Sequence, residues 1–411
     1  MRNQKSSIGW VVGLATFAVS LLGTGTPASA QQEKVLHSFY SSGYDGFFPA
    51  AGLITDSTGN LYGSTPVGGI YGGGIVFKVA PKTGGGWTTK TLHAFSGTGT
   101  DGFDPTASLI FDAKGNLYGT TYSGGAYGAG TVFELSPTVG GGWAETVLYA
   151  FHDGSDGRHP PAALIFDADG NLYGTTRQGG TYNLGTVFEL SPAVGGGWTE
   201  TVLYGFRKGS DGRYPQAALI FDASGNPYST TTQGGTYNNG TVFELKSGAG
   251  GWTEKILYNF NPNGSDGVIP FAGLVMDRAG NLYGTTNYGG AYGYGTVFEF
   301  SPTAKAEKIL HSFSGAPADG MYPFAGLIFD ASGNLYGTTT DGGAYGCGVV
   351  FAMTPTGSGW TEELAHSFCN GNGPDGAYPD AGMIFDGLGN LYGTTSGGGT
   401  YNNGTVFAIR P

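Results

Sequence analysis

The chain has 411 residues, of which 80 are glycine, and only 12% are charged. Its formal net charge is −12, so it lacks the basic surface that attracts nucleic acids and anionic membranes, and we expect neither as a partner. Glycine-rich chains are often disordered, but 39% hydrophobic and 14% aromatic residues argue for a packed, β-rich fold in which glycine serves turns.

The N-terminal segment has the pattern of a secretory signal peptide. Two basic residues precede a mostly apolar run at residues 8–22, and the tripeptide ASA ends at Ala30. We therefore predict a signal peptide at residues 1–30 that is cleaved after Ala30, leaving a single domain at 31–411. The apolar run is too short to span a membrane comfortably, and no later run approaches the required length of about 20 residues. The sequence predicts a secreted or periplasmic protein without a membrane span.

One short motif recurs along the rest of the chain. GNLYG or a close variant starts at Gly59, Gly115, Gly170, Gly225, Gly280, Gly333 and Gly389. The intervals between copies are 53 to 56 residues, and a period near 50 indicates the blades of a β-propeller.

Each repeat has four short segments rich in β-branched and aromatic residues. In the third repeat they are residues 163–168, 172–176, 185–190 and 199–206, separated by turn residues. The sequence shows no helical periodicity of useful length. Because one four-stranded sheet would leave both faces uncovered, we predict an all-β, seven-bladed β-propeller with four antiparallel strands per blade.

The chain ends predict how the ring closes. Residues 33–39 (EKVLHSF) match a fourth strand, and residues 404–409 (GTVFAI) match a third strand. We therefore expect the N-terminal strand to complete the last blade. The first strand of each repeat is expected nearest the axis, because a pair of small residues marks its start in every copy. These pairs are Ala51-Gly52, Ala107-Ser108, Ala162-Ala163, Ala217-Ala218, Ala272-Gly273, Ala325-Gly326 and Ala381-Gly382.

The GNLYGTT…GG…GTVFEL pattern resembles the GloVer (Gloeo–Verruco) tandem repeat of exported bacterial proteins. The resemblance covers residues 33–411. It implies an exported repeat protein and supplies no catalytic residues.

Two loops of each repeat should lie on the same face of the ring, which we call the loop face. Gly-Gly-x-Tyr loops supply Tyr71, Tyr127, Tyr182, Tyr237, Tyr292, Tyr345 and Tyr401. Asp-Gly-x-x-Pro loops supply Asp45, Asp101, Asp156, Asp211, Asp266, Asp319 and Asp375. Either these residues bind glycans, by ring stacking and carboxylate hydrogen bonds, or the aspartates cap turns while the tyrosines pack between blades. Sevenfold repetition favours the scaffold interpretation.

A specific site requires residues that break the repeat. On the loop face these are Arg158, His159, Arg177, Arg213, Asp341 and Asp380. The residues directly before the small axial pairs also vary: Ala50, Thr106, Pro161, Gln216, Phe271, Phe324 and Asp380. As ligand-binding candidates we select Tyr182, Tyr237, Tyr401, Arg158, His159, Arg213 and Asp380.

Other chemistries find little support in the sequence. The glycine cluster at 124–130 leads from strand to strand, whereas a phosphate-binding loop leads into a helix. Asp167-Ala-Asp169-Gly170 hints at a calcium loop, but its sister copies lack the second aspartate, which favours a turn. His37, His93, His311 and His366 are interpreted as strand-face residues. We expect no metal and no cofactor, and the catalytic residues of any activity stay unassigned.

The sequence thus predicts a monomeric binding or scaffolding protein of the cell exterior, with a glycan or a protein as partner. The alternative is a hydrolase or lyase that acts on polysaccharides near the mouth of the axial channel, so whether the chain is an enzyme stays open. Cys347 begins a third strand and Cys369 follows the neighbouring fourth strand, so the two cysteines should form a disulfide.

Overall fold

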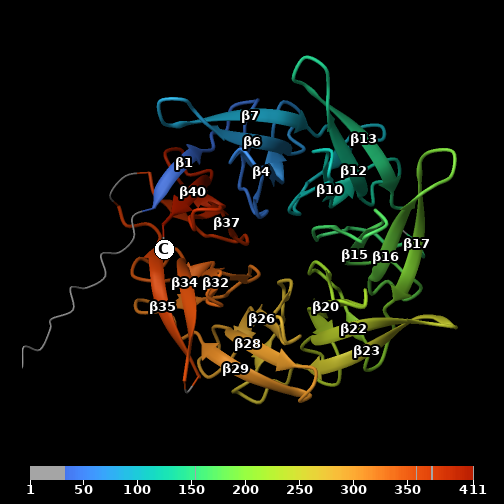
Figure 1. The fold of residues 1–411 in the computed structure, drawn as a ribbon, viewed down its shortest axis with the longest axis vertical. Helices are drawn as coiled ribbons and strands as arrows, with labels where there is room; N and C mark the ends of the chain where they lie inside the picture. The colour runs from blue at the N-terminus through green and yellow to red at the C-terminus, as the bar shows by residue number, and fades with distance from the viewer. Residues whose placement is uncertain (1–32, 153, 358, 372–373, 411) are drawn as a thin grey trace, which may run out of the picture. The chain divides into compact units, whose positions relative to one another are not determined.

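The computed structural model describes residues 33–410 except 153, 358 and 372–373. The predicted signal peptide lies outside the described residues. Seven four-stranded antiparallel sheets follow one another around a ring, which confirms the predicted seven-bladed propeller (Figure 1). Within the described residues no helix is long and apolar enough to cross a membrane.

The inner half of every blade is a short hairpin. The first strands have two residues each: β3 Ile54–Thr55, β9 Ile110–Phe111, β14 Ile165–Phe166, β19 Ile220–Phe221, β25 Val275–Met276, β31 Ile328–Phe329 and β37 Ile384–Phe385. The second strands are β4 Leu61–Thr65, β10 Leu117–Thr121, β15 Leu172–Thr176, β20 Pro227–Thr231, β26 Leu282–Thr286, β32 Leu335–Thr339 and β38 Leu391–Thr395. In every hairpin turn an aspartate accepts hydrogen bonds from backbone N–H groups two and four residues later, as Asp167 does from Asp169 and Asn171 at 2.9 Å.

The outer half of every blade is a longer hairpin. The third strands are β6 Ile75–Pro81, β12 Thr131–Pro137, β16 Thr186–Pro192, β22 Thr241–Gly248, β28 Thr296–Ser301, β34 Val349–Thr356 and β40 Thr405–Ile409. The fourth strands are β7 Trp87–Ala94, β13 Trp143–Ala150, β17 Trp198–Gly205, β23 Gly251–Asn259, β29 Ala306–Ser312, β35 Gly359–Ser367 and β1 Lys34–Ser38. Figure 1 shows the fourth strands outermost and the first two strands nearest the axis.

The ring closes as the sequence predicts. Strand β1 pairs antiparallel with β40, from Lys34 opposite Ala408 to Ser38 opposite Thr405. Phe39, directly after β1, is fully buried and packs edge-to-face on Phe77 of the first blade, with ring centroids 5.1 Å apart. The same Phe–Phe contact joins every other pair of neighbouring blades, so the closing contact repeats the interior ones.

Hydrogen bonds also join the blades close to the axis. A second-strand hydroxyl of each blade donates to an alanine carbonyl of the next, as from Thr120 to Ala162 at 3.3 Å. The bond from Thr394 to Ala51 at 3.1 Å closes the circle. A Cβ on Gly52 would lie 3.1 Å from the Gly382 carbonyl oxygen and 2.8 Å from Ser108 Oγ, so the small pairs do converge at the axis.

Two-stranded ribbons cover the loop face beside six of the blades. They pair β2 Gly46–Phe47 with β5 Val67–Gly68, β8 Gly102–Phe103 with β11 Ser123–Gly124, β18 Gly212–Arg213 with β21 Gln233–Gly234, β24 Gly267–Val268 with β27 Tyr288–Gly289, β30 Gly320–Met321 with β33 Asp341–Gly342, and β36 Gly376–Ala377 with β39 Gly397–Gly398. A single bridge between Arg158 and Gln178 takes the place of the ribbon in the third blade.

The neighbouring blade requires glycine in the loop between the second and third strands. Gly185 has a φ of 100°, and a Cβ there would lie 2.6 Å from Cδ of Pro215. Every copy has the same glycine against the next proline, which explains this part of the glycine cluster as scaffold.

Candidate functional site

The loop aspartates cap the turns that lead from one blade to the next on the loop face. Each accepts a hydrogen bond from the backbone N–H that follows the preceding fourth strand, for example from Asn370 to Asp375 at 2.6 Å. The turn-capping interpretation of these seven residues is therefore confirmed.

A ring residue of the fourth strand faces each of these aspartates. His37, His93, His311 and His366 lie 2.9 to 3.5 Å from their aspartates, so they are strand-face residues as predicted. Tyrosine hydroxyls donate to the other three at 2.8 Å, from Tyr149, Tyr204 and Tyr258.

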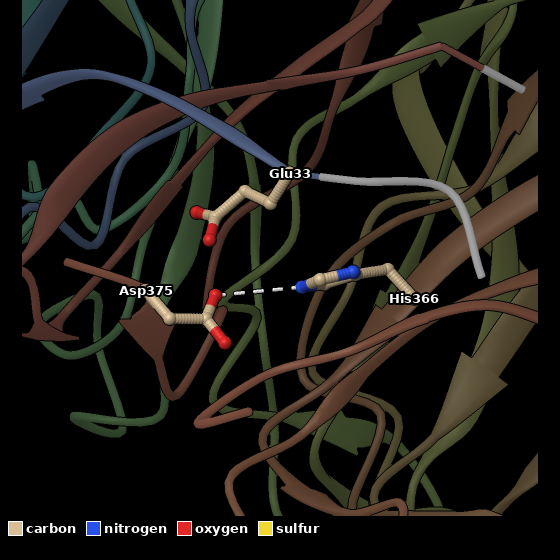
Figure 2. A group of neighbouring side chains, drawn as sticks. All are labelled: Glu33, His366 and Asp375. Carbon is tan, nitrogen blue, oxygen red and sulfur yellow. Dashed lines mark ion pairs between the residues drawn. The ribbon is translucent and has the colours of Figure 1, made fainter. Parts of the chain in front are cut away.

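At six blade interfaces a glutamate is also buried near the same aspartate. We call these interfaces the seams; their glutamates are Glu33, Glu145, Glu200, Glu254, Glu307 and Glu362. Figure 2 shows Glu33, directly before β1, beside Asp375 and His366, so one seam lies at the ring closure.

The seam at the ring closure favours one shared proton over two charges. Burial and, to a smaller extent, the adjacent Asp375 together raise the pKa of Glu33 to about 9. Burial also acts on Asp375, but hydrogen bonds from His366, Glu33 and the Asn370 N–H lower its pKa to about 2. Glu33 is thus a neutral acid near pH 7 that can donate to the Asp375 carboxylate.

Three seams have side chains of the types that bind metal ions. They are Glu33–His366–Asp375, His93–Asp101–Glu145 and His311–Asp319–Glu362. In the three sister seams a tyrosine contacts the aspartate where these have histidine. The same contact geometry with a poor metal ligand argues that the position serves blade packing.

The rim tyrosines do not pack between blades. All seven members of the Gly-Gly-x-Tyr set are 46% to 61% exposed, so the packing interpretation is wrong for them. Tyr182 borders a cavity of about 380 Å³ with Asp156, Glu200 and Arg207. Tyr237 lines none of the cavities described here, and Tyr401 stacks beside Tyr40 with ring centroids 5.9 Å apart.

Three variable positions per blade surround the axis on the loop face, and we call them the mouth. The residues before the loop proline are Phe48, Asp104, His159, Tyr214, Ile269, Tyr322 and Tyr378. The residues after it are the predicted axial set, from Ala50 to Asp380. The residues after the second strand are Pro66, Tyr122, Arg177, Thr232, Asn287, Thr340 and Ser396.

The mouth residue before the loop proline has an uncommon backbone conformation in every blade. All seven residues before the proline have φ between 56° and 66°, including the β-branched Ile269. This region is unfavourable for such residues and costs about 1–3 kcal/mol each. Each of their N–H groups donates to a carbonyl of the preceding blade, as from Tyr322 to Tyr294 at 2.9 Å. These bonds fix the same backbone in every copy while the side chain differs.

Two cavities open in the mouth. The first, of about 330 Å³, is bordered by residues of six blades and therefore lies at the axis: Ala50, Asp104, Thr106, Tyr122, Pro161, Gln216, Phe271 and Phe324. The second, of about 590 Å³, is lined by Ala50, Asn287, Tyr288, Tyr322, Phe324, Thr340, Asp341 and Asp380. The cavities share Ala50 and Phe324, so they are adjacent.

The larger cavity brings two carboxyl groups together. Asp380 accepts hydrogen bonds from Ser396 Oγ at 2.6 Å and Thr340 Oγ1 at 2.9 Å. Burial raises its pKa, these two bonds oppose the rise, and the charge of Asp341 adds to it. Burial also raises the pKa of Asp341. Asp341 and Asp380, which both break the repeat, therefore lie in one cavity.

The basic candidates lie elsewhere on the loop face. His159 stacks on Tyr122 with centroids 4.6 Å apart, and Arg177 donates to the Tyr122 hydroxyl at 2.9 Å. Both thus support a wall of the smaller cavity. Arg213 donates to Asn238, and Arg158 pairs through its backbone with Gln178; neither lines one of the two mouth cavities.

Six lining residues are not among the variable residues identified from the sequence: Asp104, Tyr122, Asn287, Tyr288, Tyr322 and Thr340. Comparing the seven copies position by position would have found them, because the motif around them is nearly constant.

Cys347 and Cys369 form the predicted disulfide, with Cα atoms 5.9 Å apart.

Comparisons with known proteins agree with the repeat and the fold. Residues 23–243 and 218–411 match the Gloeobacter/Verrucomicrobia repeat. No curated protein matches the sequence.

Solved structures of similar fold include three distant chains. An ancestral GH74 enzyme has 12% identity and a TM-score of 0.56 over 89% of this chain and 47% of its own. A chain of a Mitotic Checkpoint Complex has 11% identity and a TM-score of 0.54 over 100% and 99% of the two chains. A putative 6-phosphogluconolactonase from Bacteroides uniformis has 15% identity and a TM-score of 0.51 over 79% and 86%. At these identities the likeness supports the propeller fold alone.

Proposed function

The chain belongs to the Gloeobacter/Verrucomicrobia repeat family, and from that premise we propose that it binds a glycan in the mouth, outside the cytoplasm. The observation that carries the proposal is the 590 Å³ cavity, which combines aromatic walls with two carboxyl groups. Aromatic rings offer apolar faces to the C–H faces of sugars, and carboxylates accept hydrogen bonds from hydroxyl groups. Ligand sites generally have this composition of apolar walls and few polar groups.

The location outside the cytoplasm rests on two features. The disulfide between Cys347 and Cys369 favours an oxidising compartment. The pattern of the first thirty residues predicts export.

A glycan array probed with the secreted chain tests the proposal. We expect oligosaccharide hits whose affinity falls at least about tenfold, or about 1.4 kcal/mol, in a Tyr322→Ala/Phe324→Ala variant. Absence of any hit, or hits that the variant binds equally well, would contradict binding in the mouth.

A second candidate function is hydrolysis of the bound glycan, which the shared cavity of Asp341 and Asp380 favours. Most glycosidases use a carboxyl pair, one of which needs a raised pKa to act as the acid. Each array hit should therefore be incubated with the chain and assayed for new reducing ends. Activity that Asp380→Asn abolishes would establish this second function, whereas an absence of turnover on every hit would leave binding alone.

A further inference from the structure

The larger mouth cavity is rich in hydrogen-bond acceptors. Asp341 and Asp380 contribute carboxyl groups, and the two hydroxyl donors near Asp380 are already used on that residue. Asn287 is 6% exposed, and its carboxamide oxygen has no hydrogen-bond partner among the described residues. An unpaired buried acceptor is costly, so it favours a ligand that donates.

The cavity also lacks a positive charge of its own. None of its eight lining residues is lysine, arginine or histidine. In the described part of the chain, no ion pair is formed by Asp341 or Asp380. Two carboxyl groups in one partly buried cavity repel each other when ionised, and a cation between them removes that cost.

Aromatic faces complete the surroundings. Tyr288 and Tyr322 have ring centroids 5.2 Å apart, and Phe324 stacks on Phe271 with centroids 4.6 Å apart. Tyr288 and Phe324 are 43% and 41% exposed, so much of their surface is available to a ligand. Aromatic faces attract cations, and more strongly where water is excluded.

We propose that this cavity binds the ammonium group of an amino sugar, so that the glycan ligand is a glucosamine-type oligosaccharide with free amines. An ammonium group has three donors and no acceptor, which matches two carboxylates and the Asn287 carboxamide oxygen. The inference rests on the proposed glycan binding and names its ligand class. Tyr288 and Tyr322 provide the faces for the sugar ring and the cation.

Calorimetric titration of the secreted chain at pH 6.5, with EDTA present, tests this. The probes are a glucosamine hexamer, an N-acetylglucosamine hexamer and cellohexaose. We expect the glucosamine hexamer to bind at least about tenfold more tightly than either neutral oligomer. Asp380→Asn and Asp341→Asn should each remove most of that preference.

Asp169→Asn is the matched control, because Asp169 is exposed in a hairpin turn between the first two strands of its blade, away from the loop face. It should leave all three affinities unchanged, and unfolding temperatures should confirm that every variant folds. Equal affinity for the three oligomers would overturn the inference and leave glycan binding standing. No binding of any oligomer would overturn both. Glucosamine binding that Asp169→Asn weakens as much as Asp380→Asn would also overturn the amine site.

Discussion

The seams and the mouth are built from the same loop, yet they vary in opposite ways. Asp375 lies in a seam, and Asp380, five residues later, lies in the mouth. The loop aspartate, which lies in a seam at six of the seven interfaces, is identical in all seven copies, whereas the residue five positions later differs in most of them. Each blade interface needs the same contact, so the aspartate that makes it is constant. The mouth surrounds a single axis, so its residues can differ from blade to blade and form one asymmetric site. Within one repeat protein, constancy marks structure and variation marks the candidate site.

Removing the closing strand should have the largest effect. Deleting residues 33–40 takes away β1, its pairing with β40, and the buried Phe39 that contacts the first blade. Loss of Phe39 alone should cost about 3–5 kcal/mol. We expect the unfolding temperature to fall by more than about 10 °C in calorimetry. An unchanged unfolding temperature would show that β1 is dispensable and that its pairing with β40 does not stabilise the ring.

Two phenylalanine truncations should separate scaffold from site. Phe188 is fully buried and packs on Phe151, so Phe188→Ala should lower the free energy of unfolding by about 3–5 kcal/mol. Phe324 is partly exposed in the mouth, so Phe324→Ala should cost less than about 1 kcal/mol. Denaturant unfolding of both variants measures the difference. Comparable losses would mean that Phe324 contributes as much to the free energy of unfolding as a buried phenylalanine at a blade interface.

Stability should fall as the pH rises, because of the seams. Burial raises the pKa of Glu254 to about 9 and that of Glu200 to about 7, so the folded chain holds protons that the unfolded chain releases above about pH 4.5. Their contribution is therefore full below about pH 4.5 and is lost as the pH passes through 7 to 9. The unfolding temperature should be several degrees lower at pH 9 than at pH 5.

A Glu200→Gln/Glu254→Gln variant checks that cause, because the amide mimics the neutral acid. Its unfolding temperature should depend less on pH than that of the parent chain. A pH profile that the double variant does not change would assign the dependence to groups outside these seams.

The difference between the seams and the mouth also explains which structural features the sequence predicts. The repeat period, the small axial pairs and the matching chain ends predict the blades and their closure, since each constant residue makes one constant contact. The first strands are shorter than expected, with Ile165–Phe166 in place of residues 163–168. At the C-terminal end Asp167 already belongs to the hairpin turn, where its side chain accepts from the Asp169 and Asn171 N–H groups.

The candidate site was harder to predict. At the mouth position before the loop proline the side chain projects from a residue with positive φ, which tyrosine or isoleucine in a sequence does not reveal. Asp380 is conspicuous because none of its six copies is charged, but Tyr322 resembles many other tyrosines in the chain. Arg158 and Arg213 break the repeat too, yet they lie outside both mouth cavities. A residue that differs from its copies is informative only if its backbone faces the axis.

The smallest stability effect is expected at the rim. Because Tyr182, Tyr237 and Tyr401 are about half exposed, each change to alanine should alter the free energy of unfolding by no more than about 0.5 kcal/mol. Urea titration of the three variants decides this. A loss of 3 kcal/mol at any of them would restore the packing interpretation.

The most direct test is a glycan titration of two double variants, Tyr322→Ala/Phe324→Ala in the mouth and Tyr182→Ala/Tyr237→Ala on the rim. Each removes two aromatic side chains that are at least partly exposed or border a cavity on the loop face. Asymmetric recognition in the mouth predicts that the mouth variant loses at least about tenfold in affinity, while the rim variant loses less than about threefold. Binding that survives in the mouth variant and disappears in the rim variant would contradict it, because the repeated positions and not the varied ones would then hold the ligand.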